Sequence, residues 1–103
     1  MIHKEVFIKT LLEKAEKLTV GHYLDIRSYK RDRIIYFIRK EEDRYHVIEN
    51  GFYKDEFQVA FSEIRSLFKK ILKKEFPRSH RIRLYTMGLF DKNIAKEIKR
   101  KKI

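Results

Sequence analysis

The sequence predicts an α+β domain in which an antiparallel sheet of about four to five strands packs against two amphipathic helices, in the order α-β-β-β-(β)-α-β-α. Two stretches carry apolar residues at helical spacing, and elsewhere apolar and polar residues alternate as in half-buried strands. The 103 residues are 43% apolar, which is enough for one core. We therefore expect a single compact domain over residues 1–103, with a frayed basic end at 99–103.

The first element is predicted to be an amphipathic helix between Ile2 and Leu18. Its apolar residues recur at helical spacing, and Gly21 is expected to end the helix. The apolar stripe consists of Val6, Phe7, Ile8, Leu11, Leu12, Ala15 and Leu18.

A run of strands is predicted to follow. The first strand alternates apolar and polar residues, and the second is apolar on both faces, so we expect the second at the centre of the sheet. Asn50-Gly51 can adopt positive φ and is expected to form a tight hairpin. The predicted strands are His22–Tyr29, Ile34–Arg39, Arg44–Glu49 and Phe52–Val59, with polar turns at Lys30–Arg33 and Glu41–Asp43.

The second helix has the clearest pattern in the chain. Ser62 is expected to cap its start and Pro77 to end it. Its apolar residues, at i, i+3, i+4, i+7 and i+8, are Ile64, Leu67, Phe68, Ile71 and Leu72. A further strand is predicted from His80 to Met87, ended by Gly88, and Asp91 is expected to cap a final helix through Ile98.

Positive charge is concentrated in the last 40 residues. Residues 1–63 carry 12 Lys and Arg against 12 Asp and Glu, whereas residues 64–103 carry 14 against 3, so the whole net charge of +11 lies there. A one-sided surplus of this size attracts polyanions. Nucleic acid is therefore the expected partner.

The outer arc of the second helix is predicted to be cationic. Arg65 with Lys69, Lys69 with Lys73, and Lys70 with Lys74 are like-charge pairs at i, i+4. Each pair opposes the helix by roughly 0.2 to 0.5 kcal/mol, or about 1 kcal/mol together, which a bound polyanion would relieve. A lysine-rich helix is also a common solvated surface, so this helix alone leaves the choice open.

Further basic residues follow on the last strand and at the basic end. If these elements converge with the second helix, they form one contiguous patch of phosphate-binding groups. Tyr85 shares a strand face with Arg81 and Arg83, where it could stack on an unpaired base or cover the edge of the core. The predicted nucleic-acid-binding residues are Arg65, Lys69, Lys70, Lys73, Lys74, Arg78, Arg81, Arg83, Tyr85, Lys96, Lys99 and Arg100.

Patterns typical of catalysis are weak. His80 beside arginines could transfer a proton in a phosphodiesterase, but a surface histidine fits the same pattern. Asp25, Glu49 and Lys54 could hold magnesium in a nuclease-like site, although their spacing fits no motif. The absence of cysteine excludes disulfides and thiolate metal sites. We predict no catalytic residue, no metal and no cofactor.

The sequence therefore favours a small basic nucleic-acid-binding domain that contacts phosphates without catalysis; it does not distinguish DNA from RNA. The alternative is a protein-interaction module, either docked on an acidic partner or paired as a homodimer, and a metal-dependent nuclease comes third. The amino terminus lacks the pattern of a secretory signal, and no uncharged apolar run approaches membrane-spanning length, so we expect a cytoplasmic protein. Abundant Lys, Arg and Glu resemble the composition of heat-adapted proteins.

Overall fold

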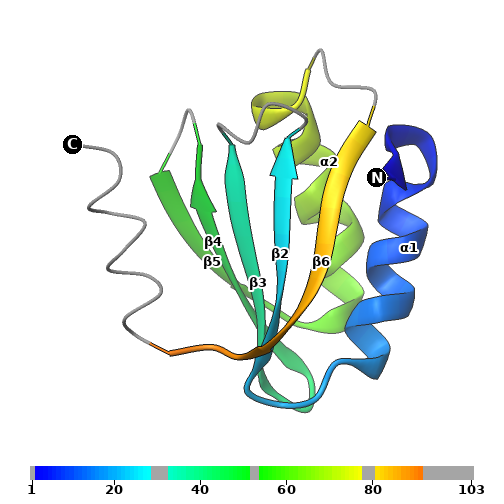
Figure 1. Cartoon of the computed structure of the whole chain (residues 1–103). Helices are drawn as coiled ribbons and strands as arrows, with labels where there is room; N and C mark the ends of the chain where they lie inside the picture. Colours follow the sequence, from blue (N-terminus) through cyan, green and yellow to red (C-terminus); the bar gives the residue numbers. More distant parts are fainter. Residues whose placement is uncertain (1, 29–32, 52–53, 78–80, 92–103) are drawn as a thin grey trace.

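A computed structural model describes residues 2–28, 33–51, 54–77 and 81–91 of the chain. Its elements are β1 (Ile2–His3), α1 (Lys4–Lys17), β2 (His22–Ser28), β3 (Ile34–Glu41), β4 (Arg44–Asn50), β5 (Lys54–Val59), the 3₁₀ turn η1 (Phe61–Glu63), α2 (Ile64–Glu75) and β6 (Arg81–Leu89). The strands form one antiparallel sheet in the order β1-β6-β2-β3-β4-β5, and both helices lie on the same face of it (Figure 1).

The predicted α+β class is confirmed, while the strand count and the element order differ. The described sheet has six strands, because a short strand, β1, stands where the first helix was predicted to begin. Ile2 pairs with Ile82, and His3 pairs with Arg81. The Nδ1 atom of His3 also accepts a hydrogen bond of 3.4 Å from the backbone N–H of Glu5, so His3 caps α1. A strand of two residues is too short to show alternation of apolar and polar residues, so the sequence pattern does not predict β1.

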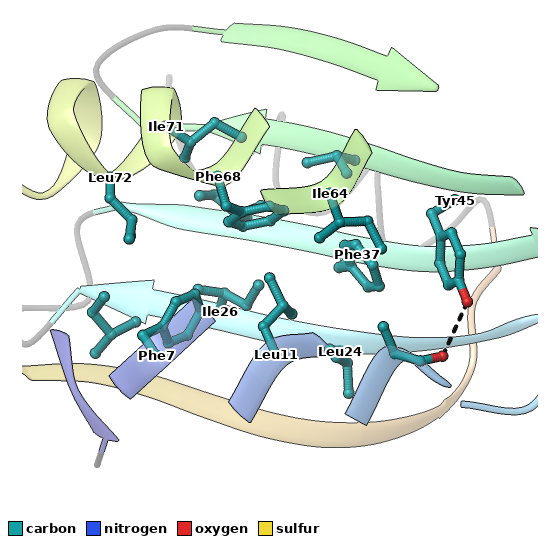
Figure 2. Packing of buried hydrophobic residues seen from close by; sticks show 14 of the residues in the cluster. Phe7, Leu11, Leu24, Ile26, Phe37, Tyr45, Ile64, Phe68, Ile71 and Leu72 are labelled. Atoms are coloured by element: carbon teal, nitrogen blue, oxygen red, sulfur yellow. Dashed lines mark hydrogen bonds between the residues drawn. The ribbon is translucent and has the colours of Figure 1, made fainter. Parts of the chain in front are cut away.

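The core lies between the sheet and the two helices. Phe7 of α1, Phe37 of β3 and Phe68 of α2 have no exposed surface and meet in the middle of the layer (Figure 2). The hydroxyl of Tyr45 in β4 donates a hydrogen bond of 3.2 Å to the carbonyl of Ala15 in α1. Full burial of each large apolar side chain stabilises the fold by roughly 1.5 to 3 kcal/mol, so both predicted apolar stripes hold helices to the sheet.

The end of α1 is fixed from a distant strand. Arg39 of β3 donates hydrogen bonds to the carbonyls of Glu16 (3.3 Å) and Leu18 (2.7 Å), which have no acceptor role within the helix. The prediction that Gly21 ends the helix is wrong, because α1 ends at Lys17. Gly21 lies in the following turn with a φ of 90°, and its N–H donates to the Arg39 carbonyl at 2.6 Å.

The four strands predicted between the helices are present as β2 to β5, with β3 in the interior of the sheet as expected. The prediction of a tight hairpin at Asn50-Gly51 is wrong. Asn50 is the last residue of β4 and pairs with Lys54, so the connection spans residues 51–53, and Gly51 does not have a positive φ. Residues 30–32 of the first predicted turn lie outside the described residues.

The ends of α2 and β6 also differ from the prediction. Ser62 lies within η1 and does not cap α2; the side chain of Glu63 instead accepts a hydrogen bond of 2.9 Å from the backbone N–H of Ala60. β6 does not stop at Gly88 but continues to Leu89, with a register irregularity opposite β2. The helix predicted to begin at Asp91 lies outside the described residues.

The sheet has a helix face and a second face, called here the far face. Side chains alternate between the two faces along each strand, so Leu24 and Ile26 of β2 join the core while Tyr23, Asp25 and Arg27 point to the far face. The far face has a small aromatic cluster of its own. Its members are Tyr23, Tyr36 and Ile38, which are buried, and Ile34, Ile48 and Phe90, which pack against them.

Candidate nucleic-acid interface

The surface of α2 that points away from the sheet is cationic. Ile64, Phe68 and Ile71 turn inward and are buried, as the apolar stripe predicts. Glu75, the single acidic residue of α2, is also buried, so no negative side chain of the helix shares its exposed arc. This arc, called here the α2 cationic face, consists of Arg65, Lys69, Lys70, Lys73 and Lys74.

Lys74 differs from the other four cations because it contacts the interior. Its Nζ atom lies 3.3 Å from Oε1 of the buried Glu49 and 5.8 Å from the centre of the Phe57 ring. For Arg65, Lys69, Lys70 and Lys73, no acidic group among the described residues lies within 4.0 Å of the charged nitrogens. Those four cations are therefore exposed without a counter-charge from the described fold.

Two buried carboxylates lie beneath the carboxyl end of α2. Burial raises the pKa of Glu49, and the hydrogen bond and charge of Lys74 act in the opposite direction. Oε1 of Glu75 lies 3.9 Å from Nε of Arg33. The Oε2 atom of Glu49 is buried without a hydrogen-bond partner. These carboxylates are covered by the fold, so they do not offer a surface for a ligand.

The magnesium site considered from the sequence is not assembled. Asp25 points to the far face of the sheet, whereas Glu49 points to the helix face, so the sheet separates them. Lys54 pairs with Asn50 at the end of the edge strand β5. Within the described ranges, no group of three or more His, Asp or Glu side chains could hold a metal ion.

The basic residues of β6 lie on the far face of the sheet. Arg83 is the cross-strand neighbour of Arg27, and Tyr85 is the neighbour of Asp25. The guanidinium of Arg27 binds the Asp25 carboxylate through two hydrogen bonds of 2.8 and 2.9 Å, which raise the pKa of the guanidinium. Tyr85 is 41% exposed, and its hydroxyl accepts a hydrogen bond of 3.4 Å from Arg83.

The far-face aromatics do not form a stacking platform. Burial, helped by the negative charge of Asp25, raises the pKa of Tyr36 to about 12. Tyr23 and Phe90 pack edge-on at a ring distance of 5.1 Å, and only 5% of Tyr23 and of Tyr36 is exposed. Tyr85 is therefore the one tyrosine of the described far face with an exposed ring.

The structure does not gather the predicted cations into one patch. The α2 cationic face lies on the helix side and points away from the sheet, while Arg81 and Arg83 project from the far face, so the sheet lies between the two groups. The condition for one contiguous patch, that these elements converge, is therefore not met by α2 and β6 within the described residues. Arg78, His80, Lys96, Lys99 and Arg100 lie outside them.

One cation near the β6 group was missed from the sequence. Arg27 lies in β2, 56 positions before its cross-strand neighbour Arg83. The missing information is strand order, because the sequence does not show that β6 inserts between β1 and β2. Strands that follow each other in the chain are usually neighbours in the sheet, and this tendency would have placed β6 beside β5.

No helix among the described residues is long and apolar enough to cross a membrane. No protein-family model, curated protein or solved structure matches this chain, so its function has to be inferred from its own residues.

Proposed function

We propose that the protein binds nucleic acid through the α2 cationic face, by contacts to phosphates and without catalysis. The observation that carries this proposal is the exposure of Arg65, Lys69, Lys70 and Lys73 along one helix, with no described carboxylate in ion-pair range. The 12 residues of α2 extend over about 18 Å. This length matches about ten charges of a duplex that carries one per 1.7 Å of its axis.

The energetics favour a polyanion as ligand. A bound phosphate backbone removes the mutual repulsion of the like-charge pairs and releases its own counter-ions to solution. Arg65 offers a planar fork to two phosphate oxygens, and the lysines offer mobile point charges. Neither group reads base edges in this arrangement, so we expect binding with little sequence preference.

The other helix provides an internal contrast. On α1 the exposed residues Glu5, Lys9, Glu13 and Lys17 follow each other at intervals of four, with alternating sign. Opposite charges at this spacing attract each other and cancel at a distance. The cationic character of α2 is therefore a property of this helix and not of the helical layer as a whole.

The test is a binding titration with protein freed of copurifying nucleic acid by nuclease and a high-salt wash. Random-sequence labelled duplex and single strand are compared between 50 and 200 mM salt. With about four phosphate contacts, affinity should fall roughly a hundredfold over this range. Lys69→Ala with Lys73→Ala should weaken binding to all sequences and reduce the salt slope by about two.

The matched control removes the same charge from α1. Lys9→Ala with Lys17→Ala should leave the salt slope close to that of the wild type, because both lysines already have acidic neighbours on α1. Equal losses in the two double variants, or binding without salt dependence, would refute the proposal. Equally tight binding of polyglutamate would assign the face to an acidic protein instead.

A further inference from the structure

Lys74 lies at the border between the α2 cationic face and the interior. Its side chain is 38% exposed, whereas the side chain of Glu49 in β4 is fully buried, and its Nζ atom lies 3.3 Å from Oε1 of Glu49. Lys74 follows Lys70 at i, i+4 along the helix, so its flexible four-carbon stem can direct the ammonium group inward to Glu49 or outward beside Lys70. One cation therefore has two possible anionic partners, a carboxylate beneath the helix and a phosphate outside it.

Glu49 depends on Lys74 to remain ionised. Burial raises the pKa of the Glu49 carboxyl, and the charges of Glu75 and Asp55 raise it further. The hydrogen bond and the positive charge of Lys74 lower it. Lys74 donates to Oε1, whereas the buried Oε2 atom has no hydrogen-bond partner in the described structure. Lys74 is therefore the main support of the ionised form.

The other groups around Glu49 do not replace Lys74. One cross-strand neighbour of Glu49 is the apolar Ile35, and the other, in β5, is acidic. Arg33 lies 3.9 Å from the buried carboxylate of Glu75. Lys74 is the one cation of the described residues within 4.0 Å of the Glu49 carboxylate. If Lys74 turns outward, Glu49 has to take up a proton or remain charged without a partner.

We propose that Glu49 controls the α2 cationic face by binding a proton: its ionised carboxylate retains Lys74, and its protonated form releases Lys74 as a further phosphate contact. One proton adds to the carboxylate of Glu49. The ammonium group of Lys74 keeps its charge and exchanges that carboxylate for a phosphate oxygen. This regulation rests on the proposed nucleic-acid binding and adds a dependence on pH to it.

Proton uptake and phosphate binding are linked because the ammonium group of Lys74 moves from one anion to the other. If Lys74 left while Glu49 stayed ionised, a buried charge would lose its partner, which is strongly unfavourable. Protonation removes that charge, and burial favours the neutral carboxyl. By linkage, a bound polyanion raises the proton affinity of Glu49 by the same factor as the proton raises the affinity for the polyanion. Nucleic-acid binding should therefore strengthen as pH falls.

Salt slopes at two pH values count the phosphate contacts. Protein freed of nucleic acid is titrated with the random-sequence duplex between 50 and 200 mM salt, at pH 8 and at pH 5. For the wild type we expect about four contacts at pH 8 and about five at pH 5, with affinity about three- to tenfold higher at pH 5 from the added contact. Glu49→Gln mimics the protonated carboxyl and should show about five contacts at both pH values.

Two further variants identify the groups involved. Glu49→Gln with Lys74→Gln leaves no buried charge and should show about four contacts at both pH values. Glu42→Gln is the matched control for the lost negative charge, because Glu42 is exposed in the turn between β3 and β4. It should keep the wild-type difference between pH 8 and pH 5. Protonation of histidines acts equally on all these variants, so it does not produce the difference between them.

Calorimetry measures the proton directly. Binding heats in two buffers of different ionisation enthalpy give the number of protons taken up per bound protein, and at about pH 6 the wild type should take up more than Glu49→Gln. Equal proton uptake by these two proteins, or a wild-type salt slope that is the same at both pH values, would overturn the regulation. The proposed function would still stand if Lys69→Ala with Lys73→Ala reduced the slope. No binding of the duplex at either pH would overturn both.

Discussion

Gly51 shows how a single methyl group affects the carboxyl end of α2. A Cβ atom at this position would lie 2.7 Å from Cδ of Glu75 and 2.8 Å from Cδ of Arg33. Glu75 is buried, so it cannot move aside without disturbing its ion pair with Arg33. We predict that Gly51→Ala lowers the free energy of unfolding by about 1 to 3 kcal/mol, measured in urea. Gly88→Ala, in open space, is the control, and an equal loss there would contradict the explanation.

Glu49 is expected to make stability depend on pH. Burial raises its pKa in the folded state above the unfolded value, so the folded state holds the proton more tightly. The resulting stabilisation is complete below the unfolded pKa and is lost as pH rises through the folded pKa. Relative to the wild type, Glu49→Gln should therefore gain stability between pH 4 and pH 7. Urea unfolding at both pH values, with the exposed Glu42→Gln as control for lost charge, tests this difference; a flat difference would refute it.

At the scale of elements, the two helices should respond oppositely to the loss of one lysine. Lys69 belongs to two of the like-charge pairs of α2, whereas Lys9 lies between Glu5 and Glu13 on α1. We predict that Lys69→Gln stabilises the protein by about 0.4 to 1 kcal/mol at low salt and that Lys9→Gln destabilises it by a similar amount. Both effects should fade at 1 M salt. Thermal unfolding measures them, and effects of the same sign would show that charge pairing does not govern these helices.

The elements that could be predicted are those whose pattern is local. The apolar stripe of α2 and the alternation in β2 follow directly from periodicity, and both were located within a residue or two of their ends. The features that were missed depend on distant residues. β1 exists because Ile2 meets Ile82, and α1 is capped by Arg39, neither of which has a signal in the neighbouring sequence. Asn50 and Gly51 show that a favourable dipeptide does not fix a two-residue hairpin, because Asn50 is still paired with Lys54 as the last residue of β4.

At the scale of the whole molecule, the sequence predicts the cations of α2 but not their position relative to the cations of β6. The periodicity of α2 shows which of its residues are exposed, but not where that face points relative to the strands. That relation depends on which face of the sheet the helix packs against. It also depends on which residues of β6 point to that face. Arg81 and Arg83 share the far face because Ile82 and Leu84 enter the core. Two cationic groups of one chain are thus separated by the sheet, although they are close in sequence.

This separation predicts different roles for two pairs of cations that carry the same charge. The α2 cationic face lies at least a helix diameter, about 10 Å, from the sheet, which is about one Debye length at 0.1 M salt. A ligand bound along α2 is therefore largely screened from Arg81 and Arg83. Arg81→Ala with Arg83→Ala should leave the salt slope of nucleic-acid binding nearly unchanged, whereas Lys69→Ala with Lys73→Ala should reduce it by about two. Parallel titrations of both double variants decide the question, because equal reductions would mean that the ligand wraps around both faces.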